Sequence, residues 1–597
     1  MKENWILTNK KESFLKLSNS IDENPLVLRL LANRGIDDIN LAKRFLYGKV
    51  KDMYDGYLMK DMKKGVSIIK NAIENNKKII IYGDYDCDGV NSTTILYKAL
   101  KKVNANYSYY IPNREEEGYG MHSGRIRKLK EEGYEVILTC DNGISAFEQV
   151  EIAKELNMEV VITDHHDIPI RENKDGVLVK CMPMADAVIN PKRSDCNYPF
   201  KMLCGAGIAL KFSKCLFDEF NIEEEAIMDL FQFAAIATVC DVVDLVDENR
   251  IIVKKGLELL NNTKNLGILE LKKSTGLFDK KLEEYHLGFV IGPCINATGR
   301  LETADLSVEL LITEDENRAK ALANQLSELN SIRQDLTKES TERVLRSLGN
   351  ELKKDDKVIV VYDKDIHESI AGIVAGRVKE KYNLPCIVLT GAKEMPKGSA
   401  RSIEGYNITE ELSKCKELIE KFGGHPMAAG LSLKEENIDI LRRRLNENCH
   451  LTDEDVVPIV KIDLPLSLSY LNEELIEVVE DLRPFGKGNP SPLFAVKDLN
   501  IERMWLLGKE KNFLKLRFSF YKNERKLYID GVTFDKLEDF RESLIEIYGE
   551  DKYIEAVETS YLNIKADVIY YPSINEFRGS RTVQMNIKNI RLKTIWS

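Results

Sequence analysis

The sequence predicts an α/β protein of several domains: a parallel-sheet unit, a long helix, a smaller α/β unit and a carboxy-terminal β barrel. Residues 77–310 alternate short apolar runs with helical patterns, which is typical of a parallel sheet covered by helices. Residues 313–348 contain neither glycine nor proline and repeat apolar residues at helical spacing. Residues 459–597 are rich in strand-like alternation. A chain of 597 residues is also too long for a single hydrophobic core.

The composition is that of an ordinary globular protein, with 43% hydrophobic and 31% charged residues. The first residues lack the apolar run of a secretory signal, and no stretch approaches the roughly 18 apolar residues of a membrane span. We therefore expect a cytoplasmic protein with no membrane association. The 11 cysteines form no CxxC pair, which argues against structural zinc and disulfides. The net charge of −11 decides little about nucleic acid, because a basic groove can coexist with an acidic exterior.

Four apolar runs in the first unit are predicted to be strands, each followed by a polar or glycine-bearing turn. In parallel α/β sheets the ligand site lies at the carboxyl ends of the strands. The residues that follow these runs are strongly acidic, so we expect the functional site at that edge of the sheet. The predicted strands are 79–82, 136–139, 160–163 and 187–189.

One long helix is predicted over 313–348. Thr313 and Glu316 have the spacing of a capping box at its start, and Gly349-Asn350 is predicted to end it. At about 1.5 Å per residue this helix would be roughly 50 Å long, enough to separate two domains and leave a cleft between them. Its apolar positions are Ala319, Leu322, Leu326, Leu329 and Leu336.

A second α/β unit and a small barrel follow. Residues 357–362 and 385–389 are predicted strands, and 372–382 a predicted helix. In the barrel, Leu514, Leu516, Phe518 and Phe520 alternate with polar residues. The window 509–526 carries seven basic and two acidic residues with several aromatics, which suits a single-strand-binding barrel. An ordinary solvated strand face is the alternative.

Three alternate aspartates, Asp84, Asp86 and Asp88, lie in the segment GDYDCDG directly after the first predicted strand. Carboxylates this close raise one another's pKa unless a cation neutralises them, so the segment predicts a divalent metal site. A calcium-binding EF-hand does not fit, because its twelfth position is Ile95 rather than Glu and a strand precedes the loop.

Later segments add Asp141, His165 and Asp241 as candidate ligands. Asp141 and His165 follow predicted strands, and Asp241 lies in an apolar segment where a lone carboxylate would be unfavourable. Five aspartates and a histidine exceed the needs of one ion, and such oxygen-rich ligation suits Mn²⁺ or Mg²⁺ better than zinc. Two ions about 4 Å apart can activate a water and stabilise a leaving oxygen, so the indicated reaction is hydrolysis of a phosphate ester.

At this point the sequence resembles the DHH phosphoesterases, named for a motif seen here as Asp164-His165-His166. Within them it resembles the RecJ family of exonucleases, and the resemblance covers nearly the whole chain. The motifs that carry it are GDYDCDG at 83–89, PNREEEGYG at 112–120, CDNGIS at 140–145, TDHHD at 163–167, NPK at 190–192, INATGRL at 295–301, GIVAGRV at 372–378, SARSI at 399–403, FGGHPMAAG at 422–430 and RPFGKGNPSPLF at 483–494.

The resemblance implies a domain organisation and an activity. The activity would be metal-dependent, 5′-to-3′ digestion of single-stranded DNA to mononucleotides, acting in DNA recombination and repair. A single-strand-binding protein and a helicase are the implied partners, and we expect a monomer. The implied domains are a DHH catalytic domain with an N-terminal extension (1–312), a connecting helix (313–348), a DHH-associated domain (349–452) and an OB-fold (453–597).

The resemblance also implies residue roles. Asp88, Asp141, His165 and Asp241 would hold one ion, and Asp84, Asp86 and Asp141 the other, so that Asp141 bridges the two. His166 would contact the scissile phosphate. The implied contacts from the DHH-associated domain to DNA phosphates are Arg377, Ser399, Arg401, Gly423, Gly424 and His425. For His425, a structural turn is the alternative.

Departures from the RecJ pattern occur at Cys294, Asp244 and 366–369, and they affect the expected DNA contacts rather than the metal ligands. Two other functions remain open. A relative that hydrolyses cyclic dinucleotides or very short RNA would share every metal residue, although such enzymes commonly lack the barrel. A catalytically silent DNA-binding scaffold would have no need of the clustered acids, which are all present here.

Overall fold

The structure is a computed structural model that divides into two compact units, Lys49–Val456 and Met1–Gly48 with Val457–Ser597. It describes residues 3–114, 117–118, 120–172, 177–351, 355–392, 395–577 and 579–594. Within the larger unit we distinguish a first lobe, residues 49–312, and a second lobe, residues 355–456. Helix α16 (Glu316–Glu351) joins the two lobes.

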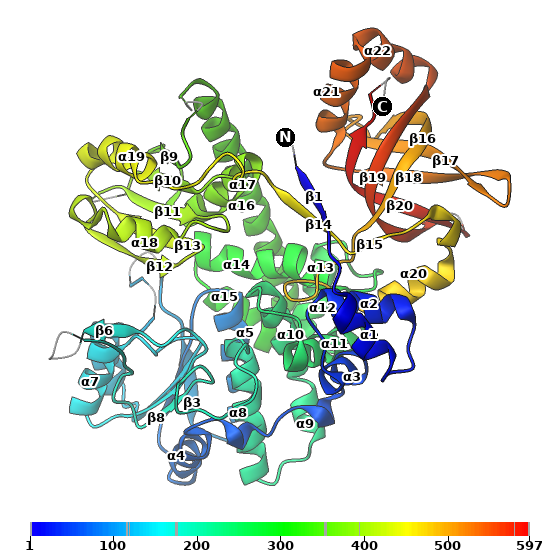
Figure 1. Cartoon of the computed structure of the whole chain (residues 1–597). Helices are drawn as coiled ribbons and strands as arrows, with labels where there is room; N and C mark the ends of the chain where they lie inside the picture. Colours follow the sequence, from blue (N-terminus) through cyan, green and yellow to red (C-terminus); the bar gives the residue numbers. More distant parts are fainter. Residues whose placement is uncertain are drawn as a thin grey trace. The chain divides into compact units, whose positions relative to one another are not determined.

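A five-stranded parallel sheet in the order β3-β2-β4-β5-β8 forms the centre of the first lobe. Its faces are both buried, because Ile79 and Ile81 pack into one apolar cluster and Ile80 and Tyr82 into another on the opposite side. Figure 1 shows helices on both sides of this sheet. The four predicted strands are confirmed to within one residue, whereas β3 was not predicted. The strands are β2 (Ile79–Tyr82), β3 (Tyr107–Tyr110), β4 (Val136–Cys140), β5 (Glu159–Thr163) and β8 (Ala187–Ile189).

Helices make up the rest of the first lobe, together with a short hairpin. Helices α4, α5, α8 and α10 contribute to the apolar cluster on one sheet face, and α6 and α7 to the cluster on the other. The remaining elements are α4 (Met62–Glu74), α5 (Cys87–Lys102), α6 (Ser123–Glu131), α7 (Phe147–Glu155), β6 (Ile170–Glu172), β7 (Leu178–Lys180), α8 (Gly205–Glu219), α9 (Glu225–Met228), α10 (Phe231–Cys240), α11 (Asp247–Asn261), α12 (Leu266–Ser274), α13 (Glu284–His286), the π-helical η3 (Leu287–Ile291), α14 (Gly292–Leu301) and α15 (Asp305–Ile312).

The long helix exists, but both of its predicted ends are wrong. Thr313 follows α15, and the cap is Asp315, whose carboxylate accepts a hydrogen bond from Arg318 N at 2.8 Å. At the other end α16 continues through Gly349 to Glu351. One glycine costs a helix only about 1 kcal/mol. Burial of Val344 and Leu348 in an apolar cluster of the second lobe offsets that cost.

The second lobe has a five-stranded sheet in the order β12-β13-β11-β10-β9, in which only β9 and β10 are parallel. The predicted strands and helix of this lobe are confirmed to within two residues. Its main elements are β9 (Ile359–Tyr362), η4 (Glu368–Ile370), α17 (Ala371–Tyr382), β10 (Cys386–Thr390), β11 (Lys397–Arg401), α18 (Ile408–Ser413), β12 (Lys421–His425), β13 (Ala428–Ser432) and α19 (Ile438–Glu447).

A β barrel dominates the smaller unit, as predicted. Its strands run in the order β15-β16-β17-β18-β20-β19, and pairing of β16 with β19 closes the ring. Leu514, Leu516 and Phe518 are fully buried, which confirms the predicted inner face of β17. The elements are β14 (Ile459–Ile462), β15 (Leu464–Pro465), α20 (Glu473–Glu480), β16 (Phe494–Leu507), β17 (Phe513–Lys522), β18 (Arg525–Thr533), α21 (Leu537–Tyr548), α22 (Glu550–Thr559), β19 (Tyr561–Phe577) and β20 (Ser580–Leu592).

The amino-terminal segment packs with this barrel rather than with the first lobe. Strand β1 (Asn4–Leu7) pairs in parallel with β14, and helices α1 (Lys11–Ser18), α2 (Pro25–Asn33) and α3 (Ile39–Tyr47) follow. Leu17 and Leu30 are fully buried in the same apolar cluster as Phe494. The sequence predicts this segment as an extension of the first domain; an amphipathic helix shows which of its faces is apolar but not which surface covers it.

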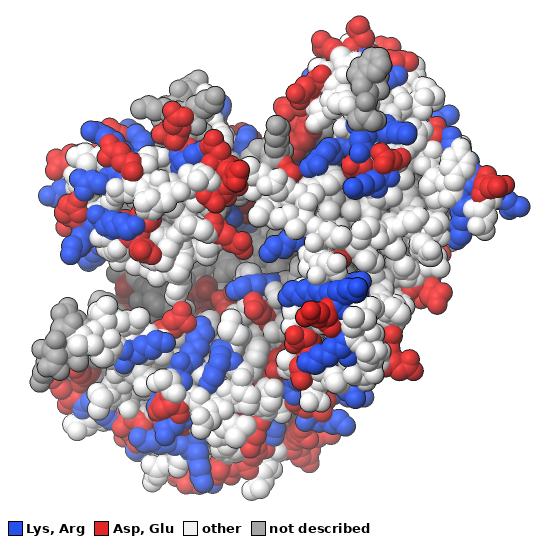
Figure 2. Space-filling model, in the orientation of Figure 1, with Lys and Arg blue, Asp and Glu red and all other residues white. Residues whose placement is uncertain are grey.

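Surface charge is mixed over the visible faces of both units. Figure 2 shows Lys and Arg interspersed with Asp and Glu, and a hollow between the two lobes of the larger unit. Among the described residues, no helix is both long and apolar enough to cross a bilayer.

Candidate metal centre and nucleic-acid interface

The candidate metal centre lies where the parallel strands of the first lobe end. Asp84 follows β2, Asp141 follows β4, and the Asp164-His165-His166 motif follows β5. These three strands are neighbours in one parallel sheet, so their carboxyl ends share an edge. Asp241 comes from the end of α10.

The structure brings together all six predicted metal ligands and His166. They form three groups, and within each group one possible ligand atom per residue lies within 4.8 Å of the others. Asp141 and His165 each belong to two groups, which is the arrangement expected of two neighbouring ions that share ligands. The groups are Asp141, His165 and His166; Asp88, His165 and Asp241; and Asp84, Asp86 and Asp141.

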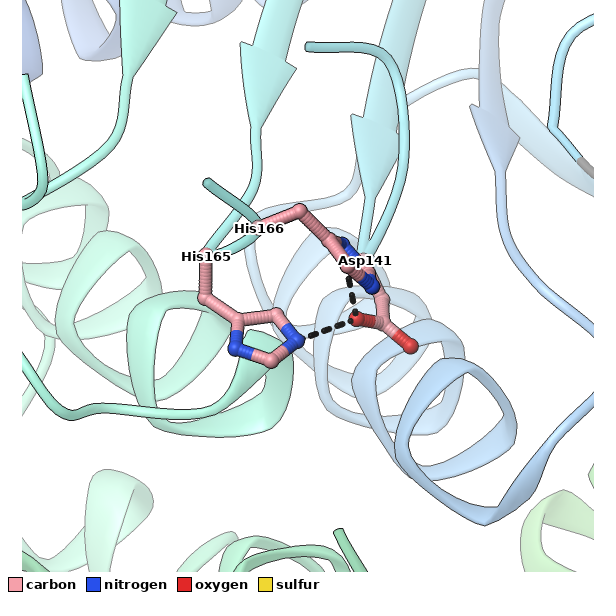
Figure 3. Close-up of side chains that lie close together, drawn as sticks. All are labelled: Asp141, His165 and His166. Carbon is pink, nitrogen blue, oxygen red and sulfur yellow. Dashed lines mark ion pairs between the residues drawn. The ribbon is translucent and has the colours of Figure 1, made fainter. Parts of the chain in front are cut away.

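His165 is at the centre of this arrangement. Its Nε2 lies 3.1 Å from Asp141 Oδ1, 3.6 Å from Asp88 Oδ2 and 3.8 Å from Asp241 Oδ2. Figure 3 shows the rings of His165 and His166 both directed at the Asp141 carboxylate. One small ion could therefore contact His165 and several carboxylates at once.

Burial makes the charges of this cluster unfavourable in the absence of a cation. Desolvation, followed by neighbouring carboxylates, raises the pKa values of Asp84 and Asp141 well above their usual range and that of Asp241 to about 8. Burial lowers the pKa of His165 to about 4, so the ring is neutral and able to bind a metal. Asp84 Oδ1 is buried and has no hydrogen-bond partner among the described residues. Carboxylate oxygens with one imidazole suit Mn²⁺ or Mg²⁺.

Hydrogen bonds fix the carboxylates of the β2–α5 loop. Asp86 is the N-cap of α5 and accepts hydrogen bonds from the N–H groups of Asp88 and Gly89 at 2.9 and 3.0 Å. Asp88 accepts hydrogen bonds from the first N–H groups of α8, those of Gly205 at 2.6 Å and Ala206 at 2.8 Å. The loop and the start of α8 are thus held together around the cluster.

Gly205 allows α8 to approach Asp141 closely. A Cβ atom at this position would lie 2.7 Å from Asp141 Cβ and 2.9 Å from its Oδ1. Gly205→Ala should therefore displace Asp141 and weaken Mn²⁺ binding by about tenfold to a hundredfold, measured by titration calorimetry. Gly376→Ala is the matched control, because a Cβ there meets nothing within 4 Å. Equal Mn²⁺ affinity in the two variants would contradict this role of Gly205.

Asp164 holds His166 in place. The fully buried Asp164 carboxylate accepts hydrogen bonds from Ile144 N at 2.8 Å and from His166 N at 3.0 Å, and its Oδ1 lies 2.8 Å from His166 Nδ1. Burial opposes the charge of His166, but Asp164 outweighs it and raises the pKa of His166 to about 9. His166 is therefore a cation at neutral pH, beside the metal ligands.

A basic cavity of about 350 Å³ lies between the two lobes. Its cations are Arg114 and Arg300 from the first lobe and Lys397 and Arg401 from the second, and Glu368 also lines it and pairs with Lys397 at 3.1 Å. Burial lowers the pKa of Arg401, and burial together with nearby arginines lowers that of Arg300 to about 10. Since converging, partly desolvated guanidinium groups favour an anion, this cavity suits a phosphate group.

Hydrogen bonds position two half-buried arginines of this cavity, Arg300 and Arg401. Arg300 Nη1 donates to Ser369 O at 2.6 Å, and Arg401 Nη1 donates to Ser399 Oγ at 3.0 Å. A Cβ at Gly372 would lie 2.7 Å from Arg401 Nη2. Ser369 belongs to the segment 366–369 that departs from the RecJ pattern. Because Arg300 contacts the backbone oxygen of Ser369, this contact does not depend on the side chain at that position.

The other predicted DNA contacts lie outside the lining of this cavity. Gly423, Gly424 and His425 are exposed on β12, and His425 Nδ1 is 3.9 Å from Asp167 Oδ2, next to the DHH motif. Arg377 is exposed on α17. Ser399 and Arg401 are thus the two predicted contacts that the structure brings to the cavity.

Sequence reasoning missed Arg114, Arg300 and the role of Asp164. Arg114 and Arg300 lie in the quoted motifs PNREEEGYG and INATGRL, so the signal was present. No local pattern, however, showed that two segments far apart in the sequence meet the second lobe at one cavity.

The basic window of the barrel is partly neutralised. Lys515 and Arg517 both pair with Asp530, at 2.9 and 2.7 Å. Both also lie over the ring of Trp505, at 5.8 and 5.4 Å from its centroid. Tyr521 and Tyr528 are exposed on the same hairpin. Aromatic groups are therefore available to bases, but the net positive charge is smaller than the sequence count indicated.

Three parts of the chain match known families. Residues 78–238 match the DHH family, N-terminal domain, residues 355–450 the DHHA1 domain, and residues 462–589 the RecJ OB domain. The single-stranded-DNA-specific exonuclease RecJ of Bacillus subtilis is 37% identical over 593 residues, covering 98% of this chain and 71% of the relative. The corresponding protein of Haemophilus influenzae is 31% identical, covering 97% of this chain and 98% of the relative. That of Escherichia coli is 32% identical, covering 95% and 96%.

Solved structures agree with this relationship. RecJ from Thermus thermophilus in complex with Mn²⁺ has the same fold, with a TM-score of 0.79 over 98% of this chain and 79% of that chain at 24% identity. An exonuclease RecJ bound to manganese is 28% identical, with a TM-score of 0.56 over 66% of this chain and 96% of that chain. Sequence identity above 30% along nearly the full length, with all three domain matches in order, shows that this chain belongs to the RecJ family of single-stranded-DNA-specific exonucleases.

Proposed function

We propose that this chain digests single-stranded DNA from the 5′ end, releases mononucleotides by phosphodiester hydrolysis with two Mn²⁺ or Mg²⁺ ions, and acts in DNA recombination and repair. The observation that carries the proposal is the set of three ligand groups sharing Asp141 and His165. The relatives are named as exonucleases of this specificity, and a RecJ structure with Mg²⁺ exists beside those with manganese.

The ligand groups support an assignment of each residue to an ion. Asp88, Asp141, His165 and Asp241 would hold one ion, and Asp84, Asp86 and Asp141 the other, with Asp141 between them. When bound, the two ions would activate a water molecule and stabilise the leaving oxygen of an in-line displacement. The protein supplies an anionic, buried cradle whose geometry is fixed by the strand ends and by the start of α8.

His166 is suited to contact the scissile phosphate. Its charge is maintained by Asp164, and its Nδ1 lies 4.0 Å from Asp141 Oδ1, the same oxygen that His165 Nε2 approaches. A cationic donor at this position would bind a non-bridging phosphate oxygen and stabilise the charge that develops there during hydrolysis.

The basic cavity is suited to the terminal phosphate of the strand. Arg114, Arg300, Ser399 and Arg401 converge on it from both lobes. A terminal phosphate carries more negative charge than an internal one, so a cavity of partly desolvated arginines would favour a 5′-phosphorylated end. Gly423, Gly424, His425 and Arg377 would contact phosphates further along the strand.

The rest of the chain has supporting roles in this proposal. The catalytic domain would comprise the first lobe, the DHH-associated domain the second lobe, and the barrel would bind the strand through its exposed aromatics. Base-edge contacts are not needed, so sequence preference should be small. We further propose a cytoplasmic monomer that works with a helicase and a single-strand-binding protein.

The decisive experiment uses matched single-stranded and duplex DNA labelled at either end, incubated with Mn²⁺, Mg²⁺ or chelator. We expect metal-dependent release of labelled mononucleotide from the 5′ end of single strands alone. Cleavage of cyclic or very short nucleotides with long DNA left intact would favour a small-nucleotide phosphodiesterase. DNA binding with neither cleavage nor bound metal would favour a scaffold.

A further inference from the structure

Two exposed aromatic rings lie on the segment that packs against the end of α10, and they have no role in the proposed chemistry. Tyr285 on α13 and Phe289 on η3 stack with ring centroids 4.9 Å apart and an angle of 23° between the ring planes. The two residues are 59% and 68% exposed. Exposed, parallel rings of this kind offer a flat apolar surface that suits another aromatic ring.

The pair is connected to the metal centre through the end of α10. Cys240 Sγ donates a hydrogen bond to Leu287 O at 3.5 Å, between the two aromatic residues in sequence. The next residue after Cys240 is the proposed metal ligand Asp241. Gly292 continues this contact, because a Cβ there would overlap Cys240 Sγ. Thus η3 and the first turn of α14 lie directly against the segment that supplies Asp241.

Helix α14 then leads past the other metal ligands to the basic cavity. Asn296 Oδ1 accepts a hydrogen bond from Cys87 N at 2.9 Å, between Asp86 and Asp88. Arg300, near the end of α14, lines the cavity. From α13 to the end of α14, the chain therefore passes the aromatic pair, then the metal-ligand segments, then the phosphate cavity. Figure 1 shows α13 and α14 succeeding one another in the first lobe.

The relevant side chains share one side of the helix. Asn296 and Arg300 are four residues apart and lie on one face. From Gly292 to Arg300 the helix rises about 12 Å, a length that a few nucleotides cover at about 3.4 Å per stacked base.

We propose that Tyr285 and Phe289 form a stacking platform for the nucleobases on the 3′ side of the bond being cut. This inference rests on the proposed function, because a strand with its end at Arg300 and its first bond at the metal ligands continues towards the pair. Bases of a single strand have free faces for such stacking, whereas those of a duplex do not. The platform therefore adds affinity without sequence preference and contributes to the selectivity for single strands.

The test compares Phe289→Ala and Tyr285→Ala with the full-length wild-type chain on a 20-nucleotide strand and on a dinucleotide too short to reach the pair. We expect KM for the long strand to rise about tenfold, with kcat little changed and the dinucleotide unaffected. Tyr285→Phe should retain wild-type behaviour. Phe278→Ala is the control, because Phe278 is another aromatic residue of the first lobe, 52% exposed. In an Asp241→Asn background, 2-aminopurine a few nucleotides from the 5′ end should be quenched, and Phe289→Ala should relieve that quenching.

The outcomes separate this inference from the proposed function. If the wild-type chain fails to digest single strands, the proposed function fails. If it digests them but the alanine variants match Phe278→Ala, or lose equal activity on the dinucleotide, the platform is refuted. It is equally refuted if abasic nucleotides at the quenched positions bind the wild-type chain as well as normal ones, or if the variants alter only thermal stability or protease sensitivity.

Discussion

Asp141→Ala should reduce DNA hydrolysis about a thousandfold or more. Asp141 belongs to two of the three ligand groups, so its loss weakens both proposed ions, and groups that act as one unit lose most of their activity when one member is removed. The measurement is single-turnover release of labelled mononucleotide at saturating Mn²⁺. Asp218→Ala is the control, since Asp218 is an exposed acid of α8.

In the absence of metal, the substitution that abolishes activity should increase folding stability. The raised pKa values of Asp84, Asp141 and Asp241 mean that ionisation opposes folding. The stability of the metal-free wild-type chain should therefore fall as the pH rises from about 4 towards 8. The stability of Asp141→Ala should fall less steeply with pH, so at pH 8 the metal-free variant should melt at a higher temperature than the metal-free wild type. The variant should also lose most of the stabilisation that Mn²⁺ gives the wild type. Wild-type activity or an unchanged metal-induced shift in Tm would contradict a bridging role.

Much of the fold followed from local patterns. The four predicted strands of the first lobe are short, continuous apolar runs, which is the pattern expected of strands that are buried on both faces of a sheet, as these are. Strand β3 is different, because it is an edge strand of sequence YSYY whose residues are all half-buried, and no apolar run marks it. The start of α16 was misplaced because Thr313 and Asp315 are both good caps, and only tertiary structure shows that α15 extends to Ile312.

The candidate site also has a part that could be predicted from the sequence and a part that could not. Most acidic ligands could be predicted because they follow strands of one parallel sheet, and sheet topology brings strand ends together. Asp241, at the end of α10, was predicted instead from its position in an apolar segment. Neither the phosphate cavity nor the aromatic platform could be predicted, because each depends on which surfaces of distant segments face one another. Arg300 and Arg401, for example, line the same cavity although they belong to different lobes, which α16 joins.

Asp164→Asn should reduce hydrolysis about a hundredfold at pH 8 although every proposed metal ligand is retained. The substitution preserves size but removes the negative charge that holds His166 protonated, so the pKa of His166 should fall from about 9 towards or below neutrality. In the wild type, the contribution of protonated His166 is lost as the pH rises through about 9. In the variant His166 should lose its proton at lower pH. The loss of hydrolysis relative to the wild type should therefore be smaller at pH 6 than at pH 8.

Folding stability gives an independent measurement of the same pair. The raised pKa of His166 contributes stability that is full below about pH 6.5 and is lost as the pH rises through about 9. The pKa of Asp164, which burial would raise but His166 lowers to about 2, contributes stability that is lost only in strong acid. The destabilisation of Asp164→Asn should therefore be largest between about pH 4 and pH 6.5 and decline towards pH 9. Asp167→Asn, at an exposed neighbour of the motif that pairs with Lys192 at 3.0 Å, should show neither change between pH 6 and pH 9. A destabilisation and activity loss in Asp164→Asn that stay constant from pH 6 to pH 9 would instead mean that Asp164 acts only through its hydrogen bonds to the backbone N–H groups of Ile144 and His166.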